Sequence, residues 1–334
     1  MDTRSRQAIS CLRLTDILEV LLPSQHHINS LPIMKTRPFI FTFLAIILSS
    51  LNSYSKGGIT AEKIGNRIDV TVNNRFFTSY LFHENEKYPF LFPVNGPLTG
   101  SSVTSLRNGE YPHHSSLFFG CDKVNGGNYW QEGLDRGRIV SAGAVIAKQD
   151  SQHVVITDEC TWMRPGAPSP VRDYRKITIS APSPALYIID FEIRLVALMD
   201  VTIEKTNHSL FSVRMDADLS VRNGGTMINA EGQSGEKATF GKQSPWIDFH
   251  GQRGKVKEGL ALLQHPSNPD YPSPWFTRDY GFISPTPLYW PASGNSTFFP
   301  KGESVTLRYR VLVHGGDTTE AGIAGEWEKY RAIP

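Results

Sequence analysis

Alternation of apolar and polar residues dominates the chain beyond about residue 60. In the segment 305–311, Val305, Leu307, Tyr309 and Val311 alternate with polar residues, and the segment 189–197 has the same pattern. A period of two residues is typical of a strand with one buried face. Shorter β-branched and aromatic segments, bounded by Gly, Pro, Asn or Asp, predict further strands at 67–72, 76–82, 139–147, 153–161, 174–180, 202–206 and 210–215. The pattern predicts a short helix only near 319–331.

Successive strands without intervening helices favour an antiparallel sandwich over a fold built from βαβ units. The region contains no repeat and no low-complexity linker, and it is longer than an immunoglobulin sandwich. We therefore expect an all-β fold, a single large antiparallel β-sandwich domain with long loops over one face. Two stretches, 93–132 and 266–290, are rich in Pro, Gly, Asn, His and aromatic residues and are predicted to be loops. Long ordered loops on a rigid sheet usually carry binding and catalytic groups.

A secretory signal peptide is predicted over residues 34–55. Lys35 and Arg37 follow Met34, the apolar run 39–51 comes next, and small residues occupy the −3 and −1 positions before Lys56. The run is shorter than the ~20 residues that a membrane-spanning helix needs. A short buried helix and an uncleaved anchor are the alternatives.

The predicted organisation of the chain has three parts. Residues 1–33 are interpreted as an over-extended reading frame or a disordered leader, 34–55 as the signal peptide, and 56–334 as the β-sandwich domain. The mature protein is expected in the periplasm or outside the cell, without a membrane span after cleavage.

Charge excludes two classes of partner. The chain has 34 basic and 32 acidic residues, and the first 55 positions hold five of the basic and three of the acidic ones, which leaves 29 of each sign. A neutral region without Lys/Arg clusters is not typical of a nucleic-acid-binding protein or of one that binds anionic lipid. Cys121 and Cys160 could form a disulfide in an oxidising compartment, or could be separate buried thiols.

The first candidate site lies around His113 and His114. Adjacent histidines can face one cleft only from a turn after Pro112, because neighbouring side chains of a strand point to opposite faces. Histidine transfers protons near neutral pH and is a common metal ligand; the simpler interpretation is one core histidine and one solvated histidine. Nearby groups typical of sugar binding, an amide, an indole and a carboxylate, come from Asn125, Trp130 and Glu132.

The second candidate site is the loop 265–281, which four prolines stiffen. Arg278 could orient a substrate while Asp279 acts as acid or base, or the two could form a salt bridge that only holds the loop. The loop also presents His265, Asn268, Trp275 and Tyr280.

Arg214, Asp216 and Asp218 form a third candidate. They are predicted to share one face of a strand, where paired carboxylates could do acid/base work or hold a cation. The alternative is the solvated face of an edge strand.

These motifs together resemble a bacterial exported family of unknown function historically labelled "methane oxygenase PmoA" (the PmoA-like family). The resemblance covers about 60–330 in the family's order and rests on 88–97, 112–117, 124–126 with Trp130, 246–248, 265–269, 278–281 and 309–317. Many members have Arg at position 115 and His at position 276, where this chain has Ser115 and Phe276, and His-Gly-Asp at 121–123, where it has Cys-Asp-Lys. The label is misleading, because no segment after Lys56 is apolar and long enough to be a membrane-spanning subunit of a methane monooxygenase.

The resemblance implies a β-sandwich of the galactose-mutarotase-like supersandwich type, shared with sugar mutarotases and several polysaccharide lyases. We therefore expect a carbohydrate-active enzyme that acts on an oligo- or polysaccharide by acid/base chemistry, with lyase, epimerase and hydrolase all open. The alternatives are a non-catalytic carbohydrate-binding module and a structural exported protein. The expected catalytic residues are His113, His114, His265 and Asp279, and the expected substrate-binding residues are Asn125, Trp130, Glu132, Arg214, Asn268, Trp275, Arg278 and Tyr280.

Two mechanisms are consistent with these residues. In the first, His113 or His114 transfers a proton with Asp279 or His265 as partner, while Arg214 and Arg278 hold a carboxylate or oxyanion and Trp130 or Trp275 stacks on the sugar. In the second, His113, His114 and His265 hold a divalent metal. Both require the two loops to converge within about 10 Å.

Overall fold

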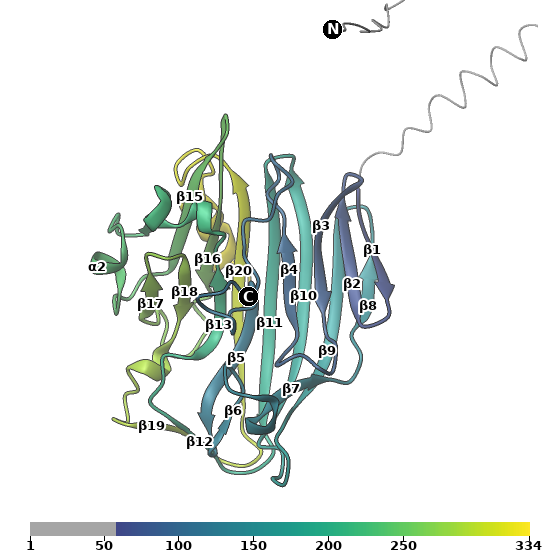
Figure 1. Ribbon diagram of the computed structural model, residues 1–334, viewed down its shortest axis with the longest axis vertical. Coiled ribbons are helices and arrows are strands. Elements are labelled where there is room, and N and C mark those ends of the chain that lie inside the picture. The colour runs from purple at the N-terminus through teal and green to yellow at the C-terminus, as the bar shows by residue number, and fades with distance from the viewer. Residues whose placement is uncertain (1–57) are drawn as a thin grey trace, which may run out of the picture. The chain divides into compact units, whose positions relative to one another are not determined.

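The computed structural model describes residues 58–334 (Figure 1). The predicted leader and signal peptide lie outside the described residues. The described part is almost entirely antiparallel strands, in one eleven-stranded and one nine-stranded sheet. The predicted all-β antiparallel sandwich is therefore confirmed. No helix among these residues has the length and apolar character needed to cross a membrane.

The eleven-stranded sheet carries most of the elements that matter for the candidate site. Its main path is β1 (Ile59–Ile64), β2 (Arg67–Val72), β3 (Arg75–Leu81), β4 (Phe90–Val94), β5 (Leu117–Val124), β13 (Ser209–Arg214), β18 (Phe282–Pro285) and β17 (Trp275–Arg278). Off this path, β12 (Val201–Glu204) pairs with β5 and with β19 (Ser296–Phe299), and β6 (Gly127–Asn128) pairs with β5.

The nine-stranded sheet contains the longest strands. Its path is β14 (Thr226–Asn229), β15 (Trp246–Arg253), β16 (Val256–Gln264), β20 (Ser304–Gly315), β11 (Leu186–Ala197), β10 (Val171–Ser183), β9 (His153–Met163) and β7 (Arg138–Ser141), with β8 (Val145–Gln149) on β9. The helices are α2 (Glu236–Thr239) and α3 (Ile323–Arg331), and 3-10 turns are η3 (Leu134–Arg136), η4 (Ala217–Leu219), η5 (Val221–Asn223) and η6 (Pro287–Tyr289).

The main core lies between the two sheets. Phe211 of β13 stacks on Phe191 of β11 at 4.6 Å and on Tyr309 of β20 at 5.1 Å between ring centroids. Along β20, Leu307, Tyr309 and Val311 are buried, as the alternation predicts. Arg308 is only half-buried and lies on the outer face, where it pairs with Glu192 of β11. A second, smaller core forms where Ile323 and Tyr330 of α3 pack on the outer face of the nine-stranded sheet, so the predicted C-terminal helix is confirmed for 323–331.

The two stretches predicted to be loops are partly strands. The first contains β5 and β6, and the second contains β17 and β18. In β5 the residues on both faces are buried, because Phe118 on the outer face is covered by Tyr88 at 4.8 Å and by Trp130 at 4.8 Å. A strand that is covered on both faces has no alternation to recognise. The predicted strand 139–147 is in turn two strands, β7 and β8.

Arg214, Asp216 and Asp218 do not share a strand face. Strand β13 ends at Arg214, and Asp216 caps the 3-10 turn η4 by accepting a hydrogen bond from the backbone of Asp218. Asp218 pairs with Arg253 at 2.7 Å. The two predicted carboxylates therefore lie in a turn that a salt bridge to Arg253 holds, and not on one face of a strand.

Cys121 and Cys160 are buried free thiols, one on β5 and one on β9. Burial raises the pKa of both thiols. The structure thus agrees with the alternative of two separate buried thiols.

A buried ionic group ties β15 to β20. Asp248 accepts from His314 Nε2 at 2.8 Å, and its other oxygen lies 3.0 Å from His250 Nδ1. Burial by itself would lower the pKa of His314, but the charge and hydrogen bond of Asp248 outweigh it and raise that pKa. Burial likewise would raise the pKa of Asp248, and the two histidines lower it.

This group predicts a pH-dependent contribution to stability. Because the folded pKa of His314 is raised, its pairing stabilises the fold fully below the unfolded pKa of about 6.5 and loses effect as the pH rises through the folded pKa. Asp248 has a lowered folded pKa, so its contribution is present above about pH 4 and falls at lower pH. The free energy of unfolding that His314→Gln removes should therefore be larger at pH 6 than at pH 9 in denaturant titrations. His83→Gln, at an exposed position, is the control, and a pH-independent loss would contradict the prediction.

Candidate active site

His113 and His114 lie in a tight turn over the outer face of the eleven-stranded sheet. The backbone N–H of His114 donates to Tyr111 O at 3.1 Å, and the two imidazole rings are 4.4 Å apart. His114 is buried between the ring of Tyr111 at 5.0 Å and that of Phe282 at 4.6 Å. His113 is half-buried, so the turn brings both rings to one place while only His113 reaches solvent.

Arg214 ends β13 directly beneath this turn. Its guanidinium lies 4.9 Å from the ring centroid of Tyr111 and 4.5 Å from that of Tyr280. The residue is 3% exposed, and its Nε and Nη1 atoms are buried without a hydrogen-bond partner among residues 58–334. His114 Nδ1 and Trp130 Nε1 are unpaired in the same way. Since a buried polar atom without a partner typically costs ~1–3 kcal/mol, this concentration of such atoms marks a candidate functional site.

His208 and Asp122 complete the group. Asp122 is buried on β5, and its Oδ2 lies 3.0 Å from His208 Nδ1, while Thr206 donates to its other oxygen. This contact turns the Nε2 edge of the imidazole away from Asp122. The His208 ring lies 6.4 Å from that of His113 and 5.8 Å from that of Trp130. We call Tyr111, His113, His114, Asp122, His208, Arg214 and Tyr280 the His–Arg cluster.

A polar pocket of about 390 Å³ opens beside the cluster. His208 and Asp122 line it, together with Gln131, Lys205 and Tyr289. Exposed carboxylates and cations also line it: Glu132, Arg136, Glu204 and Lys123. We call it the His208 pocket. Amides, carboxylates, ammonium groups and a phenol are the groups that fix a hydroxyl-rich ligand.

The electrostatics keep two of the imidazoles neutral. Burial lowers the pKa of His113, and the neighbouring His208 and Arg214 lower it further. Burial, aided by His113 and Arg214, lowers the pKa of His114 to about 2. His113 can therefore accept a proton near pH 7, whereas His114 stays neutral and serves as a hydrogen-bonding group. Burial raises the pKa of Tyr280 to about 12, so this phenol stays protonated.

The two predicted indole platforms are not accessible. Trp130 and Trp275 are each 0% exposed. Trp130 packs on Phe118, and Trp275 donates from Nε1 to Ser244 O at 2.7 Å. The prediction that either stacks on a sugar ring is wrong, because both indoles fill the space between a strand and the loop above it.

His265 and Asn268 lie on the other side of the sandwich. The His265 ring contacts Ser267 Oγ at 2.7 Å and Ile333 O at 2.9 Å, next to Tyr330 of α3 on the outer face of the nine-stranded sheet. Asn268 exchanges two hydrogen bonds with the backbone of Arg308. His265 therefore cannot partner His113 or share a metal with it. Among residues 58–334, no group of three or more His, Cys, Asp or Glu side chains is placed to hold a metal ion.

Arg278 and Asp279 are bound to α2 and not to each other. Arg278 pairs with Glu236 at 3.1 Å, and Asp279 accepts from the backbone N–H of Glu236 at 2.7 Å. Both side chains thus hold the loop, and only Tyr280 from this segment joins the cluster.

Asn125 and Glu132 also have local partners. Asn125 bridges Asp200 O and Thr202 N at the end of β5. Glu132 pairs with Arg136 at 3.0 Å at the rim of the His208 pocket. Of the predicted residues, His113, His114, Arg214 and Tyr280 come together, with Glu132 at the margin.

Sequence reasoning did not identify His208 or Asp122. His208 stands alone in a Thr-Asn-His-Ser segment, and Asp122 sits in an apolar run. The sequence offered one signal for His208: it comes shortly before the predicted strand 210–215, which contains Arg214.

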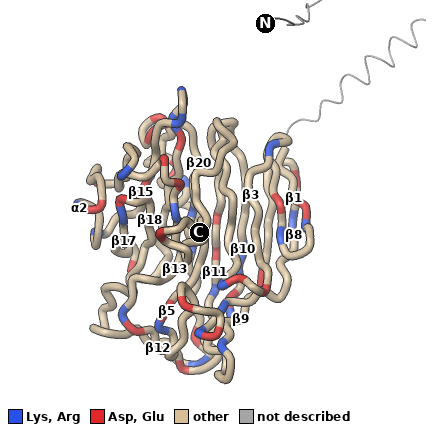
Figure 2. Tube along the Cα trace, viewed as in Figure 1, with Lys and Arg blue, Asp and Glu red and all other residues tan. Residues whose placement is uncertain are grey.

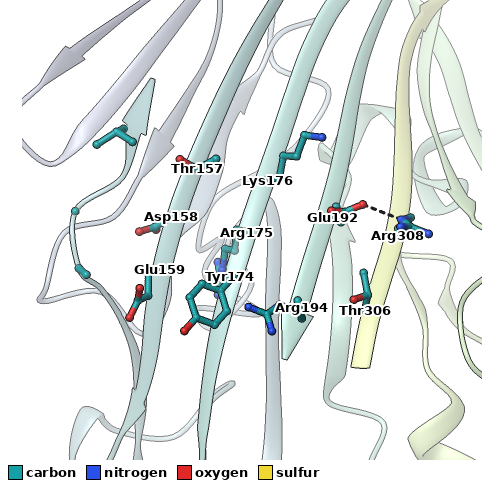
Figure 3. Close-up of a pocket in the computed structure, with 13 residues that line it drawn as sticks. Thr157, Asp158, Glu159, Tyr174, Arg175, Lys176, Glu192, Arg194, Thr306 and Arg308 are labelled. Carbon is teal, nitrogen blue, oxygen red and sulfur yellow. Dashed lines mark hydrogen bonds and ion pairs between the residues drawn. The ribbon is translucent and has the colours of Figure 1, made fainter. Parts of the chain in front are cut away.

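A larger pocket of about 550 Å³ lies on the outer face of the nine-stranded sheet (Figure 3). Figure 3 shows Lys176, Glu192, Arg194 and Arg308 projecting from β10, β11 and β20, with Arg308 paired to Glu192 at 2.7 Å. Arg194 covers the ring of Tyr174 at 4.5 Å. Its lining contains neither a histidine nor a buried unpaired polar atom, so the His–Arg cluster is the stronger candidate for chemistry. In Figure 2 basic and acidic residues are interspersed over the described strands.

Comparison with known proteins gives a family and a fold. The profile described as "Family of unknown function (DUF6807)" matches residues 67–328, and nothing in the match links the chain to the methane oxygenase name. No curated protein matches the sequence.

Three solved structures illustrate the likeness in fold. A galactose mutarotase related enzyme from Lactobacillus acidophilus has 8% identity, covers 77% of this chain and 97% of its own, and has a TM-score of 0.30. A putative kojibiose phosphorylase from the human microbiome has 8% identity, covers 83% and 37%, and has a TM-score of 0.34. A heparan sulfate lyase mutant from Pedobacter heparinus has 8% identity, covers 79% and 36%, and has a TM-score of 0.30. Galactose mutarotase-like folds are thus among the neighbours, but scores this low carry no argument about chemistry.

Proposed function

The chain belongs to a family of unknown function (DUF6807), and from the geometry of its site we propose that it is an enzyme that moves a proton on a carboxylate-bearing saccharide. The observation that carries the proposal is Arg214, a buried guanidinium with two unpaired nitrogens beside a pair of histidines. A guanidinium fork matches a carboxylate, and it stays charged at any physiological pH. The polar lining of the His208 pocket supports a hydroxyl-rich ligand next to it.

The proposed roles follow from the positions of the groups and from the lowered pKa of His113. His113 takes the proton from the carbon next to the carboxylate, and the electron pair moves onto the carboxylate oxygens, where Arg214 stabilises the developing charge. His208, oriented by Asp122, supplies a proton from the other side. If that proton goes to a leaving glycosidic oxygen, the electron pair forms a C=C bond as the C–O bond breaks, and the reaction is an elimination. If it goes instead to the opposite face of the deprotonated carbon, a new C–H bond forms with inverted configuration, and the reaction is an epimerisation. Hydrolysis usually uses two carboxylates that flank the bond, whereas imidazoles flank Arg214 here.

The proposal is tested by incubating the protein in D₂O with a panel of uronate oligosaccharides and polysaccharides, and by following exchange of the proton next to the carboxylate. In D₂O an epimerisation should place deuterium on the carbon next to the carboxylate of the product. An elimination leaves that carbon without hydrogen in the product, so deuterium there in recovered substrate marks reversible loss of the proton. Ultraviolet absorbance of an unsaturated uronate then identifies elimination, and NMR of the inverted centre identifies epimerisation. Binding without exchange or product would favour the non-catalytic carbohydrate-binding module.

We also propose that the protein works outside the cytoplasm. The sequence of charged, apolar and small residues over 34–55 supports this. N-terminal sequencing of the protein recovered from its native host should find a mature chain that begins near Lys56. A chain that begins at Met1 or Met34 would contradict the proposal.

A further inference from the structure

A third pocket, of about 640 Å³, presents two exposed aromatic residues at the margin of the eleven-stranded sheet. Trp290 is 36% exposed and Phe298 57% exposed, and both line it with Tyr271. Polar lining comes from Gln243, Asp270, Ser293, Ser296 and Thr297. Lysine and arginine are absent from this lining. We call it the Trp290 pocket.

The indole of Trp290 is held in place from the side. Tyr289 contacts it at 4.5 Å and Phe240 at 5.6 Å, and both contacts are edge-to-face. Neither neighbour therefore stacks in parallel on the ring. A large apolar ring that is fixed in place and partly exposed loses little conformational entropy when a flat ligand stacks on it.

Adjacent residues of the chain line the Trp290 pocket and the His208 pocket. Tyr289 lines the His208 pocket and Trp290 lines the other one. Backbone hydrogen bonds from Thr206 to Leu288 at 3.0 Å and from Lys205 to Asn295 at 2.7 Å hold the segments that carry the two linings together. Thr206 is the residue whose hydroxyl donates to Asp122 of the His–Arg cluster. A polymer with several sugar units could therefore contact both linings.

We propose that the Trp290 pocket is a second binding site for the same saccharide, and that it holds a sugar unit of a polymer away from the reacting unit. This inference rests on the proposed function. A pyranose ring presents an apolar face of C–H groups to an aromatic ring and hydroxyls at its edge, which matches Trp290 and Phe298 beside amide, hydroxyl and carboxylate groups. Because the lining contains no basic residue, this site recognises the ring and its hydroxyls, while carboxylate recognition stays with Arg214.

Affinity electrophoresis tests the inference. Wild type, W290A and F298A are run through gels that contain polygalacturonate, alginate, hyaluronan, heparin or xylan. At least one polymer should retard the wild type, and each substitution should weaken that binding about 10-fold, as expected for loss of an aromatic anchor. His153→Gln, on β9 of the other sheet, should leave retardation unchanged. F298A is the decisive variant, because Phe298 is exposed on the short strand β19 and its truncation should not alter the melting temperature.

Three outcomes would overturn the inference: no retardation of the wild type in any gel, equal retardation of the wild type and both variants, or a dimer that W290A and F298A dissociate in sedimentation. The last would identify the Trp290 pocket as a contact between copies of the chain. H113Q separates this inference from the proposed function, since it should lose turnover and keep retardation. Turnover that H113Q retains, with retardation still lost in F298A, would refute the proposed chemistry and leave the second binding site intact.

Discussion

Replacement of His113 by glutamine is expected to lower turnover of a uronate substrate by ~10²–10⁴-fold, the usual contribution of a positioned proton carrier. Glutamine keeps polarity and approximate size but cannot accept the proton. The half-buried position of His113 means that the turn should keep its fold. Initial rates and the melting temperature of H113Q and wild type measure the effect. H153Q is the matched control, and H265Q should also keep full turnover, since His265 lies on the other side of the sandwich.

The pH dependence adds a second readout for His113. Its pKa is lowered from 6.5 by burial and by His208 and Arg214, and a base must be unprotonated to act. The acid limb of kcat/KM should therefore fall below pH 6.5, and that limb should disappear in H113Q. EDTA should leave the rate unchanged. A chelator-sensitive rate that a divalent ion restores, or full turnover in H113Q, would contradict the assignment.

Replacement of Arg214 by methionine is expected to lower kcat by ~10²–10³-fold, while the fold keeps its stability or gains some. The substitution removes the group proposed to stabilise the transition-state charge, whose loss typically costs ~10²–10³-fold in kcat. It also removes a buried charge that has no acid partner among the described residues and keeps a side chain of similar length. Buried charges replaced by apolar side chains of similar volume are often neutral or stabilising. Rates and thermal unfolding of R214M measure both effects.

Arg175→Met is the control for R214M. Arg175 is equally buried, but it pairs with Asp173 at 2.8 Å. Removing one partner of a buried pair leaves the other charge uncompensated and typically costs ~3–5 kcal/mol. R175M should therefore unfold at a clearly lower temperature than R214M. If R214M unfolded as readily as R175M, Arg214 would be a structural residue and the ligand interpretation of its unpaired nitrogens would be wrong.

The strands that face solvent on one side were predictable from sequence. Over 189–193 of β11 and 305–309 of β20, every second residue points into the core, and the intervening residues carry polar side chains such as Glu192 and Arg308. This alternation depends on each residue's neighbours along the chain, so it is visible without any knowledge of the partner strand. The same local reasoning predicted that His113 and His114 could face one cleft only if a turn follows Pro112.

The composition of the candidate site depended on pairings that are distant in sequence. Antiparallel pairing places Cys121 opposite Ser209 and Leu117 opposite Val213. This register carries Asp122 to His208 and sets Arg214 beneath the histidine turn, and a shift of one residue would turn each side chain to the other face. No local pattern encodes which distant strand lies alongside or in which register. The sequence therefore showed which residue types the site could use: His113, His114, Arg214 and Tyr280. Tertiary structure decided their convergence, the dyad of His208 and Asp122, and the burial of Trp130 and Trp275. The reason is that strand register and the covering of a sheet face depend on segments far apart in the sequence.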